Sequence, residues 1–173
     1  ECLITVKGAE APAHMPQAKR SLALIYAVNP FGADHQSSEH DPYYEEGIGD
    51  FNLDRLKLIG LGSPQPAYSL TEEKVRFAYE TQVFYSMMDS LELCQFVFGP
   101  TWTLYGPAET VEMIRAVTGW DMSVDEMMEV GRRRLDLFRT FNAREGFGRK
   151  DDKLPKKFFK ALTGTGPTAG FAL

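Results

Sequence analysis

Apolar residues recur at helical spacing over most of this chain, whereas strand-like alternation is confined to one short segment. From Pro16, which suits the first turn of a helix, the helical spacing runs to about Val28, where Asn29-Pro30 ends it. We expect a helix over this range. The alternating segment 2–6 has no second strong strand to pair with, so it is expected to be an edge or an extended lead-in.

The most apolar part of the chain follows Ser69-Leu-Thr-Glu72, which has the form of a capping box. Apolar residues then cover several faces of one helix, which predicts a central, buried helix. They are Val75, Phe77, Tyr79, Val83, Phe84, Met87 and Met88. Asp89-Ser90 has the composition of an N-cap and predicts a second helical piece from Leu91 to Phe98, closed by Gly99-Pro100. Cys94 would then lie about one turn inside this helix.

Two further helices are indicated in the second half of the chain. One begins at Pro107 and ends before Gly119, and the next follows a second capping box, Ser123-Val-Asp-Glu126. The last helix carries one mostly apolar stripe at helical spacing, made of Val124, Met127, Met128, Gly131, Leu135, Phe138 and Asn142. With so little strand signal, the fold class is mainly α and multi-helical.

Residues 31–66 are rich in Gly, Pro, Asp and His and contain only a short amphipathic piece, residues 51–59. Such a long irregular region is where functional loops are expected.

Composition narrows the class of protein. The 173 residues, 43% of them hydrophobic, are enough for one domain with a sizeable core. A net charge of −5 argues against a nucleic-acid partner, because phosphate binding needs clustered cations. No apolar run approaches the roughly 20 residues needed to cross a bilayer. We therefore expect no nucleic acid and no membrane as partners, and a cytoplasmic location.

Cys94 and Asp89 are candidate site residues with simpler alternatives. Two cysteines are too few for a disulfide framework or for a metal site made of cysteines alone. A single cysteine most often fills space, so Cys94 is either packing or one thiolate of a metal centre. Asp89 is either an N-cap or an acceptor for the donor groups of a bound heterocycle.

His35 is the candidate for proton chemistry. It follows the helix stop in a loop with Gly32 and Asp34, and imidazole is the side chain best suited to carry protons near neutral pH. A loop histidine can equally be a solvated surface group. His14 and His40 are expected to be structural or exposed. The sequence contains no phosphate-binding loop, nucleophile elbow, His-Glu-x-x-His or Cys-x-x-Cys.

In sequence order, several blocks resemble the C-terminal region of the aldehyde ferredoxin oxidoreductase family of tungsten- or molybdenum-pterin enzymes. They are Pro12-Ala-His-Met-Pro16, Ala23-Leu-Ile-Tyr-Ala27, Gly32-Ala-Asp-His35, Asp89 to Cys94, Val117-Thr-Gly-Trp-Asp121 and Phe141-Asn-Ala-Arg-Glu-Gly-Phe-Gly-Arg-Lys-Asp-Asp-Lys-Leu-Pro155. The resemblance spans nearly the whole chain, and its last block is the most specific.

The resemblance implies an activity and a set of roles. Family members oxidise aldehydes to carboxylic acids at a metal held by two pterin dithiolenes, and pass electrons through a [4Fe-4S] cluster to ferredoxin. Cys94 then looks like the fourth cluster ligand, Asp89 like a pterin-contacting carboxylate, and His35 like the histidine near the metal. The companion glutamate would lie upstream of Glu1.

Residues 1–173 are thus expected to be the C-terminal helical region of a longer chain, which lacks the N-terminal pterin-binding domain and is inactive in isolation. The family pattern Asp-x-x-Gly-Leu-Cys commonly has Gly where this chain has Glu92, which puts the local turn in doubt. Two alternatives stay open: a non-catalytic helical scaffold or docking domain, and a divergent paralogue with another substrate.

Overall fold

The computed structural model describes residues 3–101 and 103–173, and the described chain is mainly helical, as expected. The helices are α1 (Arg20–Val28), α2 (Asp50–Leu58), α3 (Glu72–Ser90), α4 (Pro107–Thr118) and α5 (Val124–Arg144). Short 3-10 turns form η1 (Asp41–Tyr44), η2 (Arg149–Asp151) and η3 (Lys156–Phe159). No described helix combines the length and the apolar character needed to cross a membrane.

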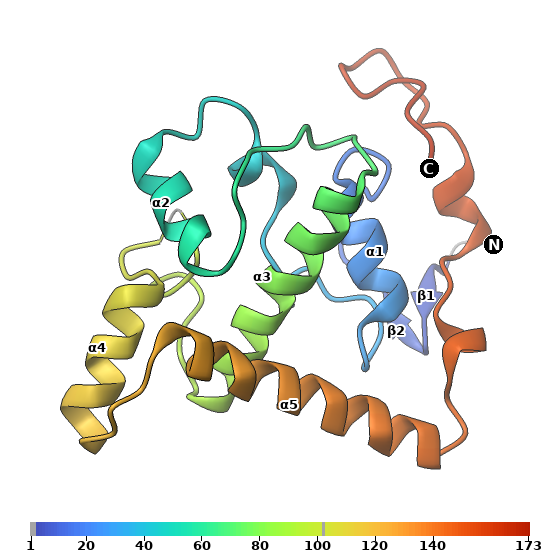
Figure 1. The fold of residues 1–173 in the computed structure, drawn as a ribbon. Coiled ribbons are helices and arrows are strands. Elements are labelled where there is room, and N and C mark those ends of the chain that lie inside the picture. Colours follow the sequence, from blue (N-terminus) through green and yellow to red (C-terminus); the bar gives the residue numbers. More distant parts are fainter. Residues whose placement is uncertain (1–2, 102) are drawn as a thin grey trace.

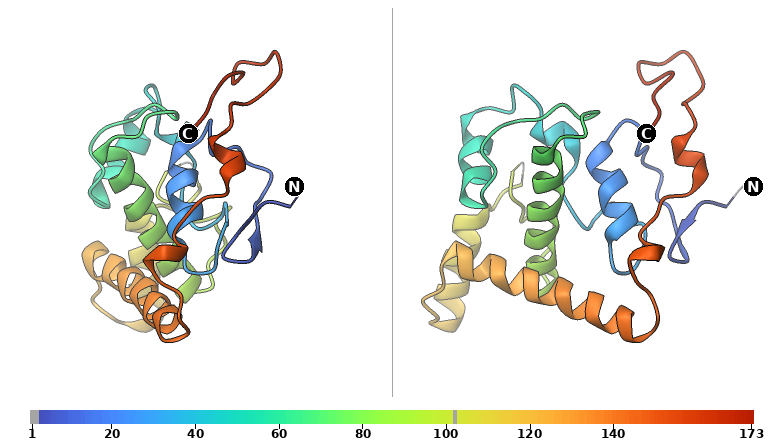
Figure 2. Two further views of the ribbon diagram at one scale, coloured as in Figure 1. Left: turned by 90° about the vertical axis from the view of Figure 1, so that its right-hand side faces the viewer. Right: turned by 45° about the vertical axis from the view of Figure 1, so that its right-hand side comes forward.

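Helix α3 is the centre of the molecule, and the other helices are arranged around it (Figures 1 and 2). Helix α1 packs along one side of α3, and α5 crosses beneath both of them. Helices α2 and α4 contact each other on the opposite side of α3 from α1. Every loop discussed below is therefore positioned by contact with α1 or α3.

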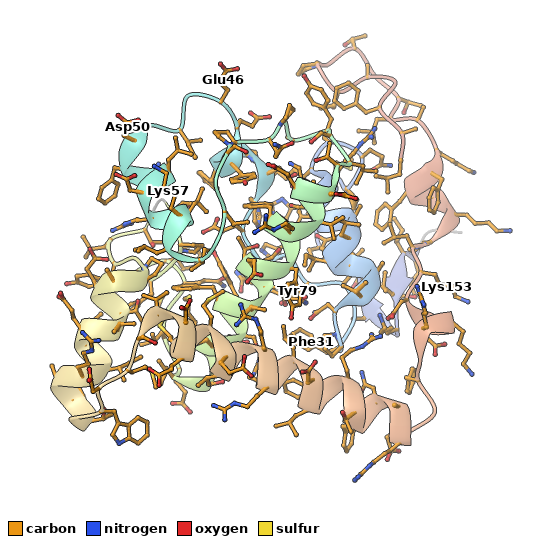
Figure 3. The ribbon with its side chains drawn as sticks, in the orientation of Figure 1. Phe31, Glu46, Asp50, Lys57, Tyr79 and Lys153 are labelled. Atoms are coloured by element: carbon orange, nitrogen blue, oxygen red, sulfur yellow. The ribbon has the colours of Figure 1, made fainter. Side chains whose placement is uncertain are left out.

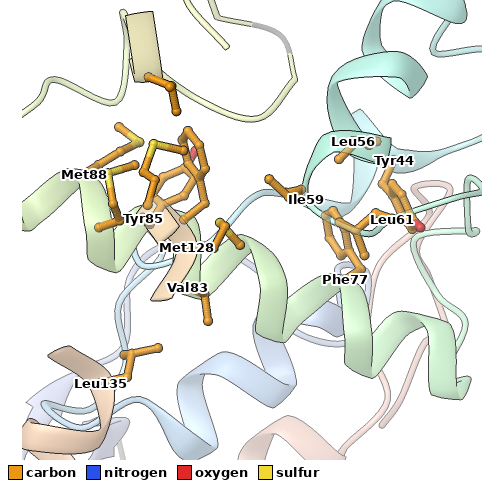
Figure 4. Packing of buried hydrophobic residues seen from close by; sticks show 14 of the residues in the cluster. Tyr44, Leu56, Ile59, Leu61, Phe77, Val83, Tyr85, Met88, Met128 and Leu135 are labelled. Carbon is orange, nitrogen blue, oxygen red and sulfur yellow. The ribbon is translucent and has the colours of Figure 1, made fainter. Parts of the chain in front are cut away.

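The main core runs along α3, whose buried side chains meet those of α5 near one end and the α2 region near the other (Figure 4). Met88, Val83 and Met128 lie at the first end, and Phe77 stacks on Tyr44 at the second, with ring centroids 4.2 Å apart. The prediction of a central, buried helix is thus confirmed for most of its apolar residues, although Val75 and Tyr79 are exposed.

Helices α3 and α5 cross at Gly131, one of the positions on the predicted stripe of α5. A Cβ atom at this position would lie 2.1 Å from the carbonyl oxygen of Val83, closer than any real contact. The Ser86 hydroxyl donates to the Gly131 carbonyl across the same crossing, at 3.1 Å. Only glycine lets the two backbones approach this closely.

Several helix ends agree with the sequence signals, whereas the starts of α1 and α3 do not. Ser123 caps α5 as predicted, and Gly119, at φ 74°, ends α4. Helix α1, however, begins at Arg20 rather than Pro16, because the N–H groups of Arg20 and Ser21 bond to Ala67 and Asp41 outside the helix. Helix α3 is capped by Thr71 rather than by Ser69, and the Thr71 hydroxyl accepts from the Lys74 N–H.

The N-terminal segment is paired, contrary to expectation. Strand β1 (Thr5–Val6) forms an antiparallel hairpin with β2 (Ala9–Glu10), a strand too short to be visible in the sequence pattern. Cys2 lies outside the described residues. The chain after α5 returns to this hairpin, where Asp152 pairs with Lys7 at 2.9 Å.

Candidate functional site

The loop that carries His35, residues 29–41, is fixed at its start by buried polar contacts. We call it the histidine loop. The Asn29 side chain donates to the carbonyl of Gly32 at 3.0 Å and accepts from Gln82 of α3 at 3.2 Å. Gly32 has φ 100°, and a Cβ atom there would lie 2.3 Å from the Val6 carbonyl oxygen. The glycine therefore permits both the left-handed turn and the close approach to β1.

The end of the histidine loop is fixed by a buried ion pair. Asp41 accepts from the Lys74 ammonium of α3 at 2.6 Å, and both side chains have no exposed surface. Its carboxylate also accepts from the backbone N–H and the hydroxyl of Ser21, at the N-terminus of α1. A carboxylate is favoured at that end of a helix. The loop thus runs back along α1 and is attached to two helices.

This path gathers all three histidines of the chain. The His14 ring lies 4.7 Å from the His35 ring and 4.8 Å from the His40 ring, measured between centroids. The rings of His35 and His40 are 6.0 Å apart. Together with Lys19 they line a cavity of about 330 Å³, which we call the histidine cavity.

The histidine cavity is desolvated enough to change the ionisation of its groups. Burial, the Lys19 ammonium and the neighbouring imidazoles of His40 and His35 lower the pKa of His14 to about 4. Burial also lowers the pKa of His40, against the effect of its hydrogen bond to the His35 carbonyl. The pKa of Lys19 is lowered by burial, which Asp41 opposes. Near neutral pH, His14 and His40 are therefore uncharged.

Sequence reasoning placed Cys94 inside a helix, and this prediction is wrong. Helix α3 continues through Asp89 and Ser90 without a break, so Asp89 is not an N-cap. The backbone N–H of Leu93 then bonds to the carbonyl of Met88, and that of Glu92 to Asp89. This pair of bonds is the Schellman pattern that ends a helix. Residues 91–98 form the cysteine turn instead of a helix.

The Schellman pattern gives a physical reason for a glycine at position 92, the residue expected there from the resemblance described above. Its residue after the helix adopts a left-handed conformation, which glycine tolerates best. In this chain that residue is Glu92, with φ 55°. The turn therefore forms in spite of the departure from glycine. Leu93 packs against the core, and Cys94 follows it on the outside.

The Cys94 side chain is exposed. Its carbonyl accepts from the N–H groups of Val97 and Phe98, both at 2.9 Å, and these backbone bonds form the turn that follows it. Gln95 and Phe96, the next two residues, line the histidine cavity together with His35. The structure therefore brings the cysteine turn and the histidine loop to one cavity, although they are 59 positions apart (94 minus 35) in the sequence.

The arrangement fits a thiolate that is one ligand among several. Within residues 3–101 and 103–173, no group of three His, Cys, Asp or Glu side chains is placed to hold a metal ion. An iron–sulfur cluster of the common type needs four thiolates. An exposed cysteine at a surface turn can supply one of them, and the other ligands would have to come from outside the described residues.

Asp89 lies on the last turn of α3, next to the cysteine turn. Its carboxylate pairs with Arg134 of α5 at 3.1 Å, and 53% of its side-chain surface remains exposed. Partial burial raises the pKa of Asp89, and Asp34 of the histidine loop acts in the same direction, while Arg134 opposes both. The interaction with Asp34 indicates that Asp89 and the histidine loop are electrostatic neighbours.

Sequence reasoning did not predict which residues surround His35. His14 and His40 were expected to be structural or exposed, and their half-buried rings pack against His35, which agrees with a structural role but was not foreseen as a contact. Lys19 was not singled out at all. The only available signal was that the three histidines flank one predicted helix. Their meeting depends on the return path of the histidine loop, which no local pattern encodes.

Comparison with known proteins matches the whole chain. Residues 1–173 fit the model of the family described as "Aldehyde ferredoxin oxidoreductase, domains 2 & 3". The chain is 28% identical over 172 residues to the tungsten-containing aldehyde ferredoxin oxidoreductase of Pyrococcus horikoshii, and 27% identical to that of Thermococcus kodakarensis. The match covers 98% of this chain but only 25% and 26% of those relatives, so the chain spans about a quarter of their length.

The relatives are named as enzymes, and their names describe them as oxidoreductases that contain tungsten. The mainly helical structure agrees with the helical region expected from the sequence. Because the family model matches from the first residue to the last, the chain belongs to the aldehyde ferredoxin oxidoreductase family.

Proposed function

We propose that this chain is the C-terminal region of an oxidoreductase that converts aldehydes to carboxylic acids and passes the electrons to ferredoxin. The observation that carries the proposal is the meeting of an exposed cysteine turn and a histidine-lined cavity in a chain that belongs to this family. The remainder of the longer protein would supply the main pterin-binding domain.

In this proposal the chain contributes one ligand and one contact to the cofactors. Cys94 would be one thiolate of a [4Fe-4S] cluster, because soft sulfur ligands suit iron. The exposed carboxylate of Asp89 would accept hydrogen bonds from a pterin that holds tungsten or molybdenum. When bound, these groups would supply the two-electron oxidation and the path along which electrons leave.

The chain's own part of the chemistry is proton transfer. Oxidation of an aldehyde by water yields a carboxylic acid, two protons and two electrons. The His35 ring is half-buried at the cavity, and its Nδ1 atom is buried without a hydrogen-bond partner in the described chain. An imidazole nitrogen of this kind is suited to take up a proton as substrate reacts and release it afterwards.

The test uses the full-length protein, prepared without oxygen. We expect iron together with tungsten or molybdenum, and aldehyde-dependent reduction of added ferredoxin. A His35→Asn variant should keep the metals but lose most of the turnover, about 100-fold, as expected for loss of a general acid or base. A protein without these metals, or a variant with undiminished turnover, would contradict the proposal.

A further inference from the structure

Lys19 lies between two of the three imidazoles of the histidine cavity. The Nε2 atom of His40 is 2.8 Å from the His35 carbonyl oxygen, which can only accept, so Nε2 carries the hydrogen. In the neutral ring the Nδ1 atom is then an acceptor. It lies 3.2 Å from the Lys19 Nζ, so the ammonium donates to it.

The same ammonium reaches His14. The distance from the Lys19 Nζ to the His14 Nδ1 is 3.4 Å, and His14 is neutral near pH 7 because its pKa is about 4. The His14 ring in turn packs against the His35 ring, 4.7 Å between centroids and tilted by 39°. Thus one neighbour of Lys19 contacts the ring of His35, and the other binds its backbone.

We propose that Lys19 is a positioning residue for His35, acting through the imidazoles of His14 and His40. The inference rests on the proposed role of His35 in proton transfer. The ammonium fixes the orientation and the neutral form of both imidazoles, and these hold the His35 ring and its carbonyl. The His35 ring, whose buried Nδ1 has no hydrogen-bond partner in the described chain, is thereby held in one orientation beside the cavity. Partners of this kind set the orientation and the basicity of a functional imidazole.

The other charged and titratable groups around Lys19 have partners of their own. Asp41 of η1 is paired with Lys74 of α3. Glu39 accepts from Thr101 at 3.3 Å and is bonded to Tyr85 of α3, whose pKa is raised by burial and by Glu39. The remaining polar side chains that line the cavity are Gln36, Ser38, Tyr43 and Gln95. The ammonium is therefore directed to the imidazoles rather than to a carboxylate.

The experiment follows each histidine in the full-length, metal-loaded protein. Exchange of the imidazole C2 hydrogen with deuterated solvent, measured peptide by peptide by mass spectrometry across pH, gives a midpoint for His14. The variants are Lys19→Met, which removes the cation, and Lys19→Arg, which keeps one. Lys57→Met is the matched control, because Lys57 is an exposed residue of α2 that pairs with Asp54 and does not line the cavity. Figure 3 labels Lys57 on α2.

We expect the His14 midpoint to rise by about one pH unit in Lys19→Met, because a nearby like charge has been removed. We expect kcat to fall about tenfold in the same variant, with KM unchanged. Lys19→Arg should restore most of the wild-type His14 midpoint and most of kcat. Lys57→Met should change neither the midpoint nor kcat.

Two results would overturn the inference. The first is an unshifted His14 midpoint in Lys19→Met, and the second is a shifted midpoint with wild-type kcat. Failure of the proposed function is a different result: His35→Asn would then keep full turnover, while the His14 shift in Lys19→Met would still be seen.

Discussion

The histidine loop and the cysteine turn face one cavity, but they are held in different ways. The histidine loop is attached to α1 and α3 through the buried side chains of Asn29 and Asp41. The cysteine turn is held by backbone bonds at the end of α3 and by the packing of Leu93. Other side chains of this chain pack against the ring of His35, whereas the side chain of Cys94 is exposed.

The difference in how the histidine loop and the cysteine turn are held indicates which contacts lie within this chain and which have to come from outside the described residues. Under the proposed function, a residue that transfers protons needs a partly desolvated place, and the chain half-buries the ring of His35. A cluster thiolate needs further sulfur ligands, which the described chain does not hold. We therefore expect changes in the histidine loop to affect folding of the chain itself, and changes at Cys94 to affect assembly with the cluster.

The largest effect is expected when the anchor of the histidine loop is broken. Asp41→Asn removes the charge that compensates the fully buried Lys74 ammonium, so the free energy of unfolding should fall by about 3 to 5 kcal/mol. Chemical denaturation measures this loss. The control is Asp54→Asn, which breaks an exposed pair with Lys57 and should cost less than about 1 kcal/mol. Equal losses of unfolding free energy in Asp41→Asn and Asp54→Asn would contradict the claim that the buried pair anchors the histidine loop.

A smaller loss is expected at the crossing that supports both regions. Gly131→Ala places a methyl group against the Val83 carbonyl, and α3 must move away from α5. We expect the free energy of unfolding to fall by about 3 kcal/mol. Gly119→Ala is not a suitable control, because Gly119 has a positive φ, whereas Gly62→Ala has open space and an ordinary φ. A variant at Gly131 as stable as the one at Gly62 would refute the close crossing.

The histidine cavity should also make stability depend on pH. The folded pKa of His14, about 4, lies below the unfolded value of 6.5, so the unfolded chain binds the proton first. The free energy of unfolding should therefore fall as the pH drops from 6.5 to 4, by about 1 to 2 kcal/mol once solvent screening is allowed for. Urea denaturation at several pH values tests this. His14→Gln should flatten this part of the profile, and an unchanged profile would argue against a desolvated His14.

The smallest effect is a gain in stability at the cysteine turn. Glu92 holds a left-handed conformation that glycine adopts without strain, although glycine loses more backbone entropy on folding. Glu92→Gly should therefore raise the free energy of unfolding by about 0.5 to 1 kcal/mol. The matched control, Glu92→Ala, retains the strain and should bring no gain. A loss of stability in the glycine variant would mean that the Glu92 side chain itself supports the turn.

The sequence predicted those elements whose signals are local. The cap at Ser123, the glycine at 119 and the apolar stripe of α5 lie within a few residues of the structure they specify. The end of α3 was misjudged because Asp89-Ser90 has the composition of an N-cap. The helix instead continues until the left-handed Glu92 ends it, and the sequence pattern gave no sign that a glutamate would adopt that conformation.

The candidate site was also predicted only in part, because the sequence pattern reveals local features and not contacts between distant residues. His35 could be singled out from its own loop, and Cys94 and Asp89 from their block. The grouping of His14, Lys19 and His40 depends on contacts such as Lys74 with Asp41, which are 33 positions apart. Pairings over that distance are fixed by packing of helices rather than by any spacing in the sequence.

The most direct test of the account compares Cys94→Ser with His35→Asn in the anaerobically prepared full-length protein, with Cys2→Ser as the control. Iron content and the electron paramagnetic resonance signal of the reduced cluster are measured. The account predicts that Cys94→Ser loses the [4Fe-4S] signal, while His35→Asn and Cys2→Ser retain it. An unaltered signal in Cys94→Ser would contradict the claim that this exposed thiol is a cluster ligand.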